Sequence, residues 1–119
     1  MKINIADEER MNLLGLLLKR MIEKNLNDTI NLKKLNNKKI FIQAGKMKVT
    51  LNISDDNIEI KRVTAIAKSN AKIRGSFDAF IRIATGKRRP FIFFIEILSG
   101  NIRIGGNPLT LLPLIKVLK

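Results

Sequence analysis

Apolar and polar residues alternate with a period of two through the middle of the chain. Val49, Leu51 and Ile53, for example, alternate with lysine, threonine and asparagine. A period of two places successive side chains on opposite faces of a β-strand. Turn-forming residues at 44–46 and 54–57 separate the runs. The pattern predicts an antiparallel meander with strands at 40–44, 47–53 and 58–61. Further strands are predicted at 71–74 and 102–104, which makes five.

Helical spacing occurs before and after these strands. The sequence therefore predicts an α/β fold, in which a five-stranded, mainly antiparallel sheet is covered on one face by helices. We expect a single domain over 1–119, with a helical N-terminal part at 1–37, strands at 38–74, and helices with the last strand at 75–119.

The first helix is predicted from Asp7, as its cap, to about Asn25. Leu13 and Leu16 widen its apolar stripe, which either packs wholly on the sheet, the simpler reading, or also serves a dimer or a lipid. The polar stretch Leu26–Asn37 is either a short second helix or a connection. The predicted inner face consists of Met11, Leu14, Leu17, Leu18, Met21 and Ile22.

A second helical region begins at Ser76, a favourable N-cap, and Gly86 is suited to its C-cap. Pro90 then precedes an apolar run, 91–98, which must be buried or must face a ligand or a partner. Glu96 is the polar residue in this run. It is interpreted as the solvent-facing position, and the alternatives are a contact for a lipid head group or an ion pair with Arg88 or Arg89.

The C-terminal segment has apolar residues at helical spacing, and Pro113 interrupts them. The helix therefore either kinks at this proline or begins there.

The stretch from 73 to 107 carries a family motif. Ala84-Thr85-Gly86-Lys87 is followed by Pro90 and then by Gly100-Asn101-Ile102-Arg103-Ile104-Gly105-Gly106-Asn107. This order resembles the sterol-carrier-protein type of lipid-binding domain. Two features depart from the family pattern: Ile97 and Leu98 stand where a Phe-Phe pair is usual, and the segment after Pro90 is about three residues longer, nearly one helical turn.

The resemblance implies a non-catalytic carrier that holds a fatty acyl, phospholipid or isoprenoid chain in an apolar cavity. Its C-terminal segment would either help to close the cavity or act as an ordinary core helix. A related alternative is a family member whose cavity is filled by its own side chains. The expected lipid-binding residues are Phe77, Phe80, Ile81, Ala84, Phe91, Phe94, Ile95, Leu98, Leu111, Leu114, Ile115 and Leu118.

The residue inventory excludes several kinds of chemistry. The 119 residues include no cysteine and no histidine, so disulfides, thiolate nucleophiles and imidazole bases are excluded. Asp78 and Glu96 are the only acids after Arg62. An acid–base mechanism needs titratable groups that converge, and two isolated acids do not favour one. We therefore expect neither enzymatic activity nor a cofactor or metal.

The formal charge of +13 indicates an anionic partner. Lys87, Arg88 and Arg89 form the densest basic cluster, which is either a solvated face or a contact with an anionic membrane surface. Nucleic acid is the rival partner. Against it, all six aromatic residues are phenylalanines, five of them in apolar contexts unsuited to base stacking.

The sequence also suggests where the protein acts and with which partners. Asp7, Glu8 and Glu9 precede the first apolar run, unlike a signal peptide, and no apolar run approaches the ~20 residues of a transmembrane helix. We expect a cytoplasmic protein that acts peripherally at the inner membrane face. An alternative role is a scaffold or accessory subunit that presents a lipid intermediate to a lipid-metabolising enzyme, and a homodimer is a further alternative.

Overall fold

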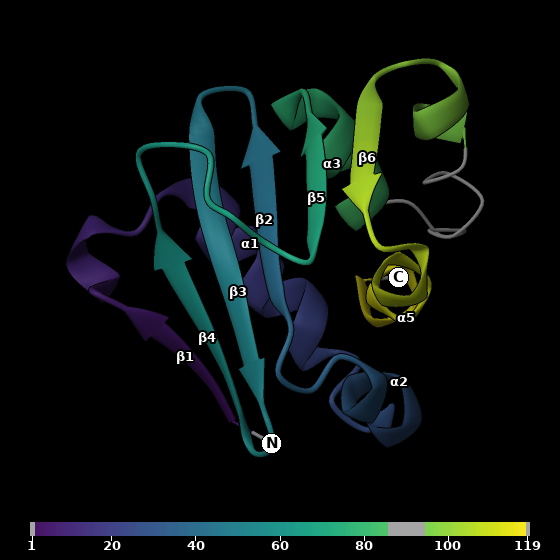
Figure 1. The fold of residues 1–119 in the computed structure, drawn as a ribbon. Coiled ribbons are helices and arrows are strands. Elements are labelled where there is room, and N and C mark those ends of the chain that lie inside the picture. The colour runs from purple at the N-terminus through teal and green to yellow at the C-terminus, as the bar shows by residue number, and fades with distance from the viewer. Residues whose placement is uncertain (1, 86–94, 119) are drawn as a thin grey trace.

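The computed structural model describes residues 2–85 and 95–118. It contains one six-stranded sheet in the order β1-β4-β3-β2-β5-β6 (Figure 1). The strands are β1 (Lys2–Ala6), β2 (Lys39–Ala44), β3 (Met47–Ser54), β4 (Asn57–Arg62), β5 (Ala71–Gly75) and β6 (Ile102–Gly106).

The sheet is mainly antiparallel, as predicted. β2–β3, β3–β4 and β5–β6 are antiparallel pairs, whereas β1–β4 and β2–β5 are parallel. The predicted count of five strands was one too few, because β1 was missed. Ile3 and Ile5 alternate with polar residues there, and both pack against the core. That alternation was the signal for a strand.

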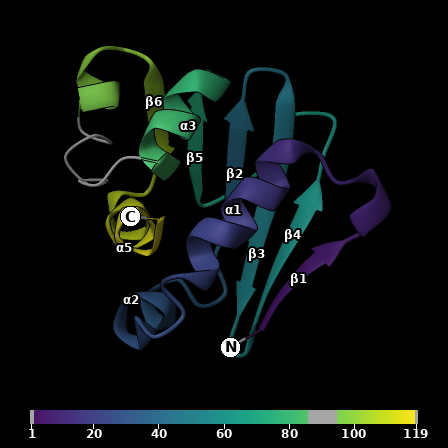
Figure 2. The same ribbon diagram turned by 180° about the vertical axis from the view of Figure 1, so that it is seen from behind.

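The helices cover one face of this sheet (Figure 2). They are a short 3-10 helix η1 (Glu8–Arg10), α1 (Leu13–Glu23), α2 (Thr29–Lys34), α3 (Phe77–Thr85) and α5 (Pro108–Leu118). Residues 95–98 form a further helical turn. Between the helices and the inner face of the sheet lies one apolar cluster, which includes Leu14 and Leu18 of α1 and Ile42, Leu51 and Ile73 of the central strands.

The opposite face of the sheet, the outer face, is crossed by the connection from β4 to β5. In Figure 1 this connection, residues 63–70, runs in front of β3 and β2. β4 and β5 run in the same direction, since both run parallel to β2. The chain must therefore cross back along the sheet between them, because a tight hairpin joins only antiparallel strands. Phe41 of β2 lies outside the main cluster yet is fully buried.

The first helix begins later than predicted. Asp7 does not cap it: this residue adopts a left-handed conformation with φ 55° and precedes η1. Helix α1 instead starts after Asn12, whose Oδ1 accepts a hydrogen bond from the Gly15 N–H at 3.0 Å. The predicted inner face is otherwise correct, since its members lie within the core or pack against it. Leu13 and Leu16 remain exposed.

The remaining helices show which of the alternatives left open by the sequence is correct. Residues 29–34 do form a helix, α2, capped by Asp28. Ser76 caps α3 as predicted, and its Oγ accepts a hydrogen bond from the Ala79 N–H at 3.2 Å. Helix α5 begins at Pro108 and continues through Pro113, so the second proline lies inside the helix.

Candidate functional site

Helix α3 directs part of its predicted lipid-binding face into the core. Phe80 is 1% exposed, whereas Phe77 and Ala84 are partly buried against the core cluster. Ile81 is half-buried. Ile83 is buried as well and was missed. The buried stripe is thus Ala79, Phe80 and Ile83, rotated by one position from the predicted one, and the apolar character of Ile83 was the available signal.

Helix α5 contributes four residues of the predicted set, as many as α3 does. Leu111, Leu114 and Leu118 are buried in the same cluster as Phe80, and Ile115 packs partly against it. Val117 joins this cluster and was not predicted. The other side of α5 exposes Leu109 and Leu112, which are 79% and 59% accessible. Helix α5 is therefore apolar on both its buried and its outward faces.

The turn at 95–98 places two of the predicted lipid-binding residues at the surface. Ile95 and Leu98 are 43% and 85% exposed, so neither is buried with the residues of α3 and α5. Ile97, between them, packs against the core. The predicted lipid-binding residues Phe91 and Phe94 lie outside the described residues, as do the basic residues Lys87, Arg88 and Arg89.

Glu96 is buried, not solvent-facing as interpreted from the sequence, and is 4% exposed. Its partner is Arg82 of α3, which was not among the expected ones. The Arg82 Nε donates to Oε1 at 2.5 Å and the other arm of the guanidinium donates to Oε2 at 2.9 Å. The Asn101 side chain also donates to Oε2, at 2.8 Å.

These contacts fix the ionisation of Glu96. Hydrogen bonding from Arg82 lowers the pKa of Glu96 to about 2 from its ordinary 4.5, against burial, which raises it. The amide of Asn101 and the positive charge of Arg82 lower the pKa further. The carboxylate is therefore ionised and engaged at neutral pH, which does not suit a general acid or base.

The surface hollows of the described part of the chain lie apart from the predicted lipid-binding side chains. Four of the best-formed hollows there are lined by none of the predicted lipid-binding residues. Residues 2–85 and 95–118 also hold no group of three or more acidic, histidine or cysteine side chains placed to bind a metal ion. Within the same ranges no helix has the length and hydrophobicity needed to span a bilayer.

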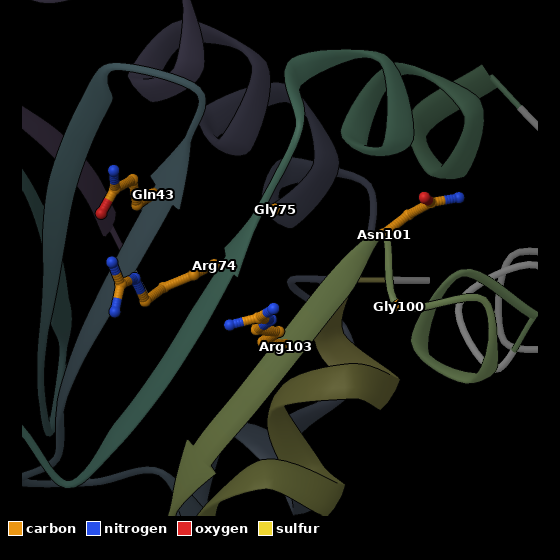
Figure 3. A pocket seen from close by; sticks show the side chains of 6 residues that line it. All are labelled: Gln43, Arg74, Gly75, Gly100, Asn101 and Arg103. Atoms are coloured by element: carbon orange, nitrogen blue, oxygen red, sulfur yellow. The ribbon is translucent and has the colours of Figure 1, made fainter.

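The hollow at the β5–β6 end of the sheet is polar. It measures about 250 Å³ and is lined by Gln43, Arg74, Gly75, Gly100, Asn101 and Arg103 (Figure 3). These side chains come from three strands and a turn, so the sequence pattern does not predict that they lie together.

Comparison with known proteins gives the family. The model of the SCP-2 sterol transfer family matches residues 16–119. Among solved structures, "UbiJ-SCP2 Ubiquinone synthesis protein" is similar with a TM-score of 0.67 at 10% identity, covering 88% of this chain and 84% of that one. The sterol carrier protein domain 2 of Helicoverpa armigera gives 0.65 at 17% identity, with 95% and 90% covered. Sterol carrier protein 2 from Yarrowia lipolytica in its apo form gives 0.61 at 14%, with 96% and 93% covered. No match was found among curated protein sequences.

Proposed function

The chain belongs to the SCP-2 sterol transfer family, and we propose that it carries a lipid chain without changing it chemically. One observation carries this proposal. Helices α3 and α5 lie on the same face of the sheet and direct Phe80, Leu111 and Leu114 into one apolar cluster. Burial of an acyl or isoprenoid chain against such a surface is favourable by ~25 cal/mol per Å².

The lipid would be held between α3, α5 and the turn at 95–98. Phe80, Leu111 and Leu114 are buried in the chain without a ligand, so a lipid that contacts them would have to displace the groups that now bury them. Ile95 and Leu98 support this location, because they are exposed next to Ile97, which touches the core. An exposed leucine beside a core contact offers a first apolar surface to an incoming chain.

A carrier role, as opposed to an enzyme, is supported by the polar groups near this cluster. Glu96 is held as a carboxylate by Arg82 and Asn101. Asp78 is exposed in the first turn of α3, where a negative charge favours the helix dipole. The two acids have different surroundings and do not form a reacting pair.

We also propose that the carrier docks on anionic membranes through Lys87, Arg88 and Arg89. These three charges precede the apolar run 91–98 in the sequence. Each basic residue near an anionic surface contributes about 1 kcal/mol, and salt screens the attraction.

An accessory role is the second candidate. One of the solved structures with a similar fold is named "UbiJ-SCP2 Ubiquinone synthesis protein", so that protein is described as one of ubiquinone synthesis. The burial of this apolar cluster also suits a subunit that presents a lipid only when a partner enzyme opens it. Leu13 and Leu16, exposed on α1, offer a surface for such a partner or for a second copy of the chain.

Native mass spectrometry of the purified protein, with organic extraction, tests the carrier proposal. A lipid adduct in near-stoichiometric amount supports it and gives the ligand class. A mass equal to that of the bare chain, with no uptake from mixed vesicles, overturns the carrier role and favours the accessory one.

A further inference from the structure

A row of polar and basic side chains crosses the outer face of the sheet, on the side opposite the apolar cluster. The strand register places Lys48 of β3 beside Gln43 of β2, Gln43 beside Arg74 of β5, and Arg74 beside Arg103 of β6. Adjacent strands lie ~4.8 Å apart, so these four residues form one continuous row. Figure 3 shows Gln43, Arg74 and Arg103 along the near side of their strands.

The two arginines are an unfavourable pair by themselves. Arg74 and Arg103 are direct partners in an antiparallel ladder, where like charges destabilise the sheet. Within residues 2–85 and 95–118 the ion pairs are Asp7–Arg10 and Arg82–Glu96, so neither arginine is paired with a carboxylate there. Two exposed guanidinium groups whose Cβ atoms are ~5 Å apart are suited to share one tetrahedral oxyanion.

The other residues on the outer face of the sheet do little to neutralise the two arginines. The outward-facing residues of the six strands include one acid, Glu59 of β4. In the register Glu59 pairs with Asn52 and Asn4, on rows that do not contain the arginines. The outward-facing basic residues are Lys2, Lys39, Lys48, Lys61, Lys72, Arg74 and Arg103.

The row also borders a preformed hollow, the polar one of about 250 Å³. Gly75 allows the chain at Asn101 to approach closely at the edge of this hollow, because a Cβ at position 75 would lie 2.7 Å from the Asn101 carbonyl oxygen. Gln43 donates through Nε2 to the Gly45 carbonyl at 2.9 Å. Its Oε1 is buried and accepts no hydrogen bond from the described residues, so the protein's own groups leave this site incompletely satisfied.

We propose that Arg74 and Arg103, with Gln43 and Lys48 beside them, bind the phosphate group of an anionic ligand on the outer face of the sheet. Arginine binds phosphate in a bidentate manner, and charge-assisted hydrogen bonds of this kind are about twice as strong as neutral ones. The phosphate belongs to a phospholipid head group or to a soluble phosphate ester. This site is separate from the apolar cluster and does not depend on lipid uptake.

The sheet face does not favour nucleic acid as the source of the phosphate. Base stacking requires exposed aromatic rings, and Phe41, the aromatic residue among the strands, is fully buried.

The test uses the full chain and the double variant Arg74→Glu with Arg103→Glu. The matched control is Lys33→Glu with Lys34→Glu, two exposed lysines at the end of α2, which changes the net charge equally. Binding of glycerol phosphate and inorganic phosphate is followed by NMR shifts of residues 43, 74 and 103. Co-sedimentation is measured with phosphatidylcholine vesicles that do or do not contain phosphatidylglycerol.

The proposal predicts that the arginine variant weakens phosphate binding by at least about tenfold, whereas the lysine control changes it little. Binding of soluble phosphates identifies a soluble ligand, and binding of phosphatidylglycerol vesicles alone identifies a head group. The variant Arg74→Lys with Arg103→Lys keeps the charge and should retain part of the affinity.

Three results overturn the proposal: binding of neither soluble phosphates nor phosphatidylglycerol vesicles by the wild-type chain, equal loss in the lysine control, or binding confined to an oligonucleotide. Thermal unfolding of each variant shows whether it is folded. Because phosphate binding and lipid extraction are measured separately, failure of one leaves the other standing.

Discussion

Arg82 and Glu96 form a two-pronged ion pair that joins helix α3 to the turn at 95–98. The two residues stand on either side of the segment 86–94, so the pair links the chain before that segment to the chain after it. Asn101 extends the link, because it binds the same carboxylate and its N–H donates to the Glu96 carbonyl at 3.0 Å. The start of β6 is thereby held against the same turn.

This pair makes stability depend on acid pH. The pKa of Glu96 is lowered to about 2 in the folded chain, so its stabilising contribution is present above 4.5 and is lost as the pH falls through about 2. Glu96→Gln should cost roughly 1–3 kcal/mol at neutral pH, a range that allows for the half-exposed Arg82 side chain. Urea unfolding at several pH values measures both effects.

Asp78→Asn is the matched control, because Asp78 is an exposed acid on the same helix as Arg82. If the wild-type chain and the Glu96→Gln variant lose stability in parallel between pH 4.5 and 2, the carboxylate is not engaged as described.

The second prediction concerns Leu98, which is 85% exposed and belongs to the predicted lipid-binding set. Leu98→Asp should leave the melting temperature nearly unchanged and reduce lipid uptake several-fold, because it places a charge on the first apolar contact for the lipid. Leu109→Asp is the control, since Leu109 is 79% exposed but outside the set. Uptake of a fluorescent fatty acid compares the two, and an equal effect of both changes would place the site elsewhere.

The third prediction tests how fully the apolar cluster is packed. Phe80→Ala should destabilise the chain by about 3–5 kcal/mol, the cost of a large cavity in a close-packed core. Phe77→Ala, at a partly buried position, should cost on the order of 1–2 kcal/mol. Guanidinium denaturation measures both. Nearly equal small losses would show that Phe80 borders open space instead of packed side chains.

The fourth prediction concerns docking. Arg88→Glu combined with Arg89→Glu should slow lipid transfer to phosphatidylglycerol vesicles and leave transfer to neutral vesicles unchanged, since the attraction is electrostatic. Stopped-flow transfer at two salt concentrations measures the effect, which should shrink as salt rises. A slowing that persists with neutral vesicles would show that these residues act on the lipid site itself.

The sequence predicted the elements better than the contacts. The period-two runs located five strands because one face of the sheet is buried, and Ser76 located the start of α3. Asp7 and Asn12 are both suitable residue types for the cap of the first helix. The structure uses Asn12 because the short helix η1 follows Asp7, and the sequence pattern does not indicate η1.

The partner of Glu96 and the pairing of Arg74 with Arg103 were not predictable. Arg82 lies 14 positions before Glu96, on a different helix, so only the packing of α3 against the turn brings them together. Hydrophobic spacing likewise identifies apolar side chains but not whether the space between them is filled. Arg74 and Arg103 became neighbours only through the β5–β6 register.

The edge strand β1 covers apolar side chains of its neighbour β4, and this affects how the chain behaves in solution. It lies before the family-matched range, which starts at residue 16, and pairs with β4 along Lys2 to Ala6. Without it, the edge of the sheet would move to β4, and the buried Ile58 and Ile60 would lose the cover of Ile3 and Ile5. An open strand edge of this kind recruits other chains and leads to aggregation. A chain without residues 2–6 should therefore keep its helices yet associate edge to edge, which makes β1 a guard against aggregation.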